Sequence, residues 1–166
     1  MTDPLTEGTR AGELVALLTA RGETVATAES LTAGLLAATI AGVPGASNVL
    51  RGGLVVYATD LKTTLAGVDG RELAEDGPVA ESTARGLADG ARTRCSADWG
   101  IGLTGVAGPD TQDGHPVGTV FLGISGATGT TVRELALSGD RWRIRSSAVS
   151  AAVSGLLERV KESTAG

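Results

Sequence analysis

The feature that most constrains the fold is a regular alternation of short β-branched or apolar runs with segments of helical periodicity. Such alternation is typical of α/β proteins, in which helices cover both faces of a sheet. Strands are expected at 24–28 (TVATA), 53–57 (GLVVY), 99–104 (WGIGLT), 119–125 and 131–137. Helices are expected at 9–20, 35–41 (LLAATIA), 59–65, 80–95 and 140–161. We therefore predict a three-layer α/β/α domain with a mixed sheet.

The connections refine this prediction. The last two strands are joined by GATG, which indicates an antiparallel hairpin. Residues 1–166 contain no internal repeat, no low-complexity tract and no linker-like stretch, so a single domain is expected. Aromatic residues make up only 2% of the chain, so Ala, Val, Leu and Ile must build the core.

Composition also excludes several classes of function. A net charge of −5 provides no basic surface for nucleic acid, so no nucleic-acid partner is expected. Cys95 and His115 are the only cysteine and histidine, too few for a disulfide or a metal site built on these residue types, and we interpret both as structural or incidental. No apolar run approaches the ~20 residues that cross a bilayer, and the N-terminus does not resemble a secretory signal. We expect a cytoplasmic protein without metal, cofactor or membrane partner.

Ser30 is a candidate nucleophile because it lies between the first predicted strand and the helix that follows. In open α/β sheets, ligands bind at the carboxyl ends of strands, where loops enter helices. Unpaired N–H groups at a helix start could stabilise an oxyanion there. The alternative is that Ser30 or Thr32 simply caps the helix. The neighbouring Glu29 could supply either a helix-start charge or catalytic support.

A serine nucleophile needs a base, and the chain offers few candidates. His115 lies in a Gly/Pro loop with no carboxylate that the sequence assigns to it. Of the two lysines, Lys161 falls at the end of the last predicted helix, whereas Lys62 follows strand 53–57, five positions after Tyr57. Partial burial at the sheet edge would keep the Lys62 amine neutral. The alternative is a solvated lysine on a helix surface.

Two further segments could bind an anion or a carbonyl oxygen. The Gly-rich loop TGVAGP follows strand 99–104, and such turns let backbone amides approach a ligand. A sharp turn explains the loop equally well. Arg141 and Arg145 are four residues apart on one predicted helix face and could hold a phosphate. Alternatively, both are solvated or paired with acidic residues.

Six blocks of sequence occur in a fixed order: AESLTAG, VPGAS, GGLVVYATDLK, TGVAGP, PVGTV and GDRWRIR. Together they resemble the C-terminal domain of the competence/damage-inducible protein family, CinA. The resemblance extends from about Leu14 to about Leu157. It implies a three-layer α/β/α fold and, as activity, deamidation of nicotinamide mononucleotide to nicotinic acid mononucleotide and ammonia. This reaction is a step in pyridine nucleotide salvage.

The resemblance also implies roles for individual residues. It places the nucleophile at Ser30, the general base at Lys62 and a hydrogen-bonding partner at Tyr57. The candidate substrate contacts are Thr32, Gly34, Thr104, Gly105 and Arg145, the last as a phosphate ligand. The expected partner is a small-molecule nucleotide, and the family suggests a homo-oligomer.

Two positions depart from the family pattern. Where many members read AESCTGG, this chain has Leu31 and Ala33, which could alter the pocket shape and the approach of a phosphate. A competing interpretation is a non-catalytic pyridine-nucleotide-binding or regulatory module linked to competence or DNA-damage responses. A third is an amidase with a different substrate range. Release of ammonia would distinguish an enzyme from a sensor.

Overall fold

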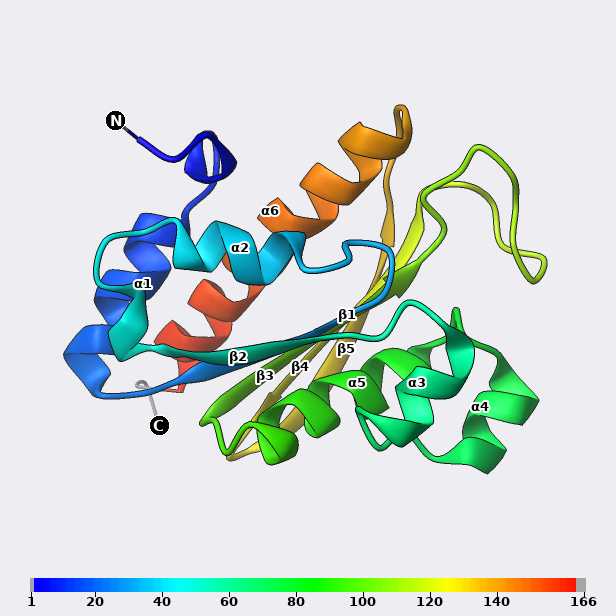
Figure 1. The fold of residues 1–166 in the computed structure, drawn as a ribbon, viewed down its shortest axis with the longest axis horizontal. Helices are drawn as coiled ribbons and strands as arrows, with labels where there is room; N and C mark the ends of the chain where they lie inside the picture. Colours follow the sequence, from blue (N-terminus) through cyan, green and yellow to red (C-terminus); the bar gives the residue numbers. More distant parts are fainter. Residues whose placement is uncertain (1, 164–166) are drawn as a thin grey trace.

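The computed structural model describes residues 2–163 and shows a five-stranded sheet with helices on both faces (Figure 1). The strands are β1 (Val25–Glu29), β2 (Leu50–Val55), β3 (Trp99–Gly105), β4 (Thr119–Gly126) and β5 (Gly129–Ala136). Their order is β2-β1-β3-β4-β5. Strand β1 is parallel to β2 and β3, whereas β3, β4 and β5 pair antiparallel. The predicted α/β fold with a mixed sheet is confirmed.

Two groups of helices cover the sheet (Figure 1). One face carries α1 (Ala11–Arg21), α2 (Leu35–Ala41) and α6 (Arg141–Glu162), and the other carries α3 (Thr59–Thr64), α4 (Gly70–Asp76) and α5 (Glu81–Arg94). Short 3-10 turns occupy Pro4–Thr6 and Ala46–Asn48. Within residues 2–163, no helix is both long and apolar enough to span a membrane.

Helix α4 was not predicted from the sequence. It buries only Leu73, so it carries almost no apolar periodicity. The helix begins where the side chain of Asp69 accepts hydrogen bonds from the backbone N–H groups of Arg71 and Glu72. The hydrogen bonds of this N-cap stabilise α4, which gains little stability from burial of its side chains.

The strands differ in burial according to their place in the sheet. The central strands β1, β3 and β4 are buried almost throughout, because helices cover both of their faces. The edge strands β2 and β5 alternate between exposed and half-buried positions. Strand β2 begins at Leu50 and ends at Val55, earlier than predicted, so Tyr57 lies beyond the strand.

Helix α5 packs directly on the backbone of β3 and β4. A Cβ atom at Gly102 of β3 would lie 2.5 Å from the carbonyl oxygen of Ala84 in α5. Gly100 and Gly123 approach the α5 backbone in the same way. Glycine in a strand interior often marks such a close approach of another backbone. The backbone of α5 therefore packs directly against the backbone of the sheet, and no large aromatic side chain is needed to fill the space between them.

Candidate active site

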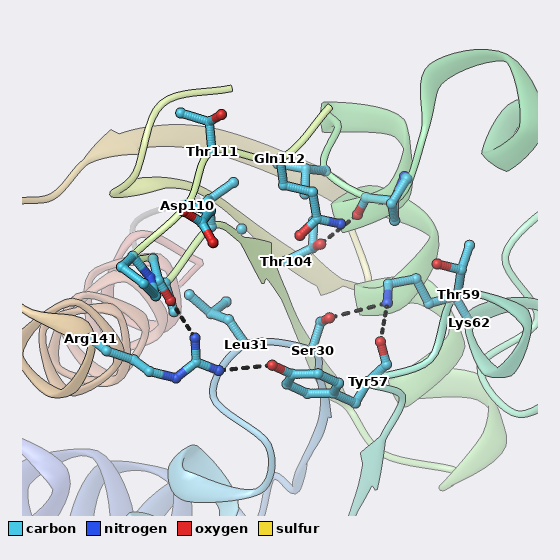
Figure 2. A pocket seen from close by; sticks show the side chains of 17 residues that line it. Ser30, Leu31, Tyr57, Thr59, Lys62, Thr104, Asp110, Thr111, Gln112 and Arg141 are labelled. Atoms are coloured by element: carbon cyan, nitrogen blue, oxygen red, sulfur yellow. Dashed lines mark hydrogen bonds between the residues drawn. The ribbon is translucent and has the colours of Figure 1, made fainter. Parts of the chain in front are cut away.

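A pocket of about 290 Å³ opens where the carboxyl ends of β1, β2 and β3 meet (Figure 2). Its wall comes from segments that are distant in the sequence: the residues after each of these strands, the segment before α5 and the start of α6. Side chains labelled in Figure 2 include those of Ser30, Tyr57, Lys62, Thr104 and Arg141.

Ser30 is held in this pocket by the sheet. Its backbone N–H donates to the carbonyl oxygen of Leu103 in β3 over 2.9 Å, so parallel pairing continues past the end of β1. The residue is 9% exposed. Its Oγ accepts a hydrogen bond from Nζ of Lys62 at 3.1 Å (Figure 2). The structure therefore brings the proposed nucleophile and the proposed base into contact.

Lys62 is buried, with 1% of its surface exposed, so the alternative of a solvated lysine is wrong. No carboxylate lies within ion-pair distance of its amine in residues 2–163. Burial lowers the pKa of Lys62 below the ordinary value, because the charged form loses hydration and gains no opposite charge.

Two carbonyl groups orient the Lys62 amine. Besides Ser30, Nζ contacts the carbonyl oxygens of Val56 at 2.8 Å and Tyr57 at 3.2 Å. A carbonyl oxygen can only accept, so each of these two contacts uses an N–H of the amine. In the neutral amine, the lone pair then faces Ser30. This arrangement suits transfer of the serine proton to the lysine nitrogen.

The side chain of Tyr57 takes part in a bridge across the pocket. Its hydroxyl accepts a hydrogen bond from Nη2 of Arg141 at 2.8 Å, and Nη1 of Arg141 donates to the carbonyl oxygen of Gly108 at 2.6 Å (Figure 2). The Tyr57 ring is largely exposed. Tyr57 therefore contacts Lys62 through its backbone carbonyl, while its hydroxyl is bonded to Arg141.

Thr104 and Gly105 line the pocket at the end of β3. The Thr104 hydroxyl donates to the carbonyl oxygen of Pro78, which ties β3 to the segment before α5. Gly105 packs against β4, where a Cβ atom would lie 2.5 Å from the carbonyl oxygen of Thr119. Both residues thus form part of the pocket wall at this end of the sheet.

Three of the predicted substrate contacts do not line this pocket. Thr32 is fully buried, and its Oγ1 has no hydrogen-bond partner among the described residues. Gly34, with φ of +94°, precedes α2. Arg145 donates from Nε to the carbonyl oxygen of Leu31 at 2.9 Å and from Nη2 to that of Thr32 at 3.2 Å. The arginine that lines the pocket is Arg141, one helical turn earlier.

Glu29, rather than Ser30 or Thr32, caps α2. The helix begins at Leu35, and neither hydroxyl bonds its N-terminus. The buried Glu29 carboxylate accepts hydrogen bonds from the N–H groups of Leu36 at 2.8 Å and Ala37 at 3.1 Å. The capping alternative for Ser30 and Thr32 is therefore wrong, and Glu29 supplies the helix-start charge.

The loop between β1 and α2 leaves backbone N–H groups beside Ser30 without a partner among the described residues. The N–H groups of Leu31 and Thr32 donate no hydrogen bond within residues 2–163. Leu31 lines the pocket directly after Ser30. Unpaired N–H groups next to a nucleophile are the donors that an oxyanion requires. Among the same described residues, no cluster of His, Cys, Asp and Glu is arranged to hold a metal ion.

Comparison with known proteins identifies the relatives of this chain. The family model of the CinA C-terminal domain matches residues 8–160. A CinA-like protein from Frankia casuarinae is 48% identical over 142 residues, which are 86% of this chain and 33% of that protein. A putative competence-damage inducible protein from Streptococcus pneumoniae is 45% identical over 133 residues, 80% of this chain and 32% of that protein. The chain thus spans about a third of the length of these relatives.

Solved structures agree with the sequence matches. The competence/damage inducible protein CihA from Agrobacterium tumefaciens superposes with a TM-score of 0.86 at 33% identity, covering 89% of this chain and 92% of its own. A CinA superfamily protein from Klebsiella pneumoniae gives a TM-score of 0.89 at 28% identity, covering 92% and 96%. On the family match, the relatives and the shared fold, this chain belongs to the CinA C-terminal domain family.

Proposed function

We propose that this protein is an amidohydrolase that deamidates nicotinamide mononucleotide to nicotinic acid mononucleotide and ammonia. The observation that carries the proposal is the 3.1 Å contact between Ser30 Oγ and the amine of Lys62 inside a pocket. A buried lysine without a carboxylate partner has one evident use beside a serine, namely to take its proton. Membership of the CinA family is consistent with this chemistry.

Acylation begins when the neutral Lys62 amine takes the proton of the Ser30 hydroxyl. The Ser30 oxygen forms a bond to the carboxamide carbon, and the electron pair of the C=O bond moves to its oxygen. The free N–H group of Leu31, which lines the pocket beside Ser30, is the proposed donor to this oxyanion. One such donor typically contributes about 3 kcal/mol to the transition state. When the C–N bond breaks, protonated Lys62 gives its proton to the departing nitrogen, which leaves as ammonia.

Deacylation repeats the sequence with water as the nucleophile. Lys62 takes a proton from water while the water oxygen attacks the acyl-serine carbon. Cleavage of the ester bond releases the carboxylic acid, and Lys62 returns its proton to the Ser30 oxygen. The acid ionises at neutral pH, so the net change converts one carboxamide and one water into a carboxylate and an ammonium ion. Lysine here takes the part that histidine has in serine proteases.

Arg141 is the proposed ligand for the nucleotide phosphate. Its guanidinium lines the pocket, and its partners, the hydroxyl of Tyr57 and the carbonyl of Gly108, are both neutral. A phosphate is a stronger acceptor for a guanidinium than either group, because it carries the opposite charge and can accept two parallel N–H bonds from the planar fork. Exchange of these partners for the phosphate would open the bridge as substrate enters.

The test is release of ammonia from nicotinamide mononucleotide by the purified protein and its variants. Ser30→Ala and Lys62→Met should each lower kcat by at least about 10³-fold. The matched control is Ser138→Ala, because Ser138 is exposed and lies outside the pocket. Near-normal turnover by Ser30→Ala would refute the assignment. Tight binding of the nucleotide without turnover by the parent would favour the non-catalytic binding module.

A further inference from the structure

We propose that Arg145 is a positioning residue that holds the loop after the nucleophile, residues 31–34, in its working conformation. The inference rests on the proposed function, since it concerns the same serine. Arg145 does not line the pocket, and no carboxylate lies within ion-pair distance of it in the described chain. The half-buried Arg145 guanidinium makes both of its hydrogen bonds with this loop.

The two contacts fix consecutive peptide planes. Nε and Nη2 of Arg145 form one edge of the planar guanidinium, and they bind the carbonyl oxygens of Leu31 and Thr32 respectively. The peptide group is planar, so holding a carbonyl also holds the N–H on the other side of the same bond. The Leu31 carbonyl thereby orients the N–H of Thr32. The Thr32 carbonyl orients the N–H of Ala33.

These planes connect Arg145 to the nucleophile and to the proposed oxyanion donor, the N–H of Leu31. The N–H of Ala33 donates to the carbonyl oxygen of Ser30 at 3.1 Å, so the second plane is tied to the backbone of Ser30. The Ser30 carbonyl shares its peptide plane with the N–H of Leu31, the unpaired donor that lines the pocket. A shift of Arg145 would therefore move both the attacking group and the Leu31 N–H proposed to stabilise the oxyanion.

The loop needs such support because its conformation is strained. Ala33 has φ of +48°, in the left-handed region that side chains other than glycine rarely adopt, and Gly34 follows with +94°. The left-handed conformation costs about 1–2 kcal/mol for a residue with a Cβ atom. Strained backbone persists only where surrounding contacts over-determine it. The Arg145 fork is the side-chain contact that holds the carbonyls on the N-terminal side of Ala33.

A kinetic comparison of two substrates separates positioning from phosphate binding. Arg145→Ala should lower kcat about 10²-fold for both nicotinamide mononucleotide and nicotinamide riboside, which lacks the phosphate, with KM nearly unchanged. Arg141→Ala is the contrasting variant, because it should raise KM for the nucleotide far more than KM for the riboside. Arg145→Lys should recover only part of kcat, because an ammonium cannot span two carbonyls as a fork does. If Arg145→Ala raises only KM for the nucleotide, or leaves kcat unchanged, the inference is wrong.

Amide hydrogen exchange provides a readout that needs no activity. The N–H groups of Ala33 and Leu35 are bonded to the carbonyl oxygens of Ser30 and Thr32, so they report on the loop. Both should exchange at least tenfold faster in Arg145→Ala, or in Arg145→Lys should the first variant not fold, and at the parent rate in Arg141→Ala. An inactive parent with this exchange pattern would refute the proposed function and support the loop-holding role. An active parent with unchanged exchange in the Arg145 variants would overturn only the role of Arg145.

Discussion

Replacement of Glu29 by glutamine tests how the start of α2 is fixed to the sheet. The buried carboxylate accepts three hydrogen bonds: Oε1 from the N–H of Leu36, and Oε2 from the N–H of Ala37 and the hydroxyl of Thr27. A carboxamide of the same shape has one acceptor oxygen, so its NH2 group must face at least one of these donors.

The size of the stability change is estimated for the amide orientation that keeps the most hydrogen bonds. The oxygen then keeps the contacts to Ala37 and Thr27, and the NH2 group faces the N–H of Leu36, which lies 2.8 Å from Oε1 of Glu29. One buried donor left unpaired costs about 1–3 kcal/mol. Loss of the negative charge at the helix start adds about 0.3–1 kcal/mol. Glu29→Gln should therefore lower the free energy of unfolding by roughly 1.3–4 kcal/mol.

Urea denaturation of the parent and the variant measures this change. The matched control is Glu75→Gln, because Glu75 is exposed on α4 and should change stability by less than about 0.5 kcal/mol. Comparison of the m values shows whether both proteins unfold from equally compact states. If Glu29→Gln unfolds at the parent midpoint with the same m value, the carboxylate does not anchor α2 and the reasoning fails.

Three further predictions concern Lys62, Ala33 and Gly102. Because burial lowers the pKa of Lys62, kcat/KM should rise with pH and level off before an ordinary lysine titrates, and a plateau only above pH ~10.4 would contradict this. The charged amine destabilises the folded protein, and this cost is relieved once the folded amine has lost its proton. Between the folded pKa of Lys62 and the ordinary lysine value, the free energy of unfolding should therefore rise with pH in the parent but not in Lys62→Met. Ala33→Gly should stabilise the protein by about 0.5–1 kcal/mol by relieving a positive φ, and a lower urea midpoint would count against the strain. Gly102→Ala should destabilise the protein by more than about 3 kcal/mol, because its Cβ would meet the Ala84 carbonyl. Gly12→Ala is the control, since Gly12 faces open space on α1 and an alanine there should raise the thermal midpoint. Equal thermal midpoints for these two variants would refute the packing argument.

Most of the fold could be predicted because its elements carry strong local patterns. The buried strands are continuous apolar runs, and α5 and α6 are long enough for their periodicity to be evident. Helix α4 escaped prediction because it buries a single leucine, although Asp69 is a capping signal that could have found it. The start of β2 was missed because its pairing begins in Leu50-Arg51-Gly52, residues with little β-propensity whose place is set by the backbone of β1.

The site was harder to predict because its contacts join distant segments. The scarcity of lysines and the family resemblance pointed to Lys62, and the structure shows why a buried amine is possible there, since two carbonyls receive it. The spacing of Arg141 and Arg145 correctly indicated one helix face. It could not indicate that one turn of α6 separates the pocket wall from the loop carbonyls. No local signal reveals that the Glu29 carboxylate reaches the following helix.

The bridge across the pocket has a consequence for how the protein is made. Tyr57 follows β2, Gly108 follows β3, and Arg141 begins α6, so this pocket wall joins three widely spaced stretches of chain. The ribosome releases these stretches in order, so the arginines of α6 emerge after the other two. Until then the pocket around Ser30 and Lys62 lacks the wall formed by Arg141, and the loop after Ser30 lacks its hydrogen bonds from Arg145. A nascent chain is therefore expected to remain unable to bind or turn over substrate until α6 is in place.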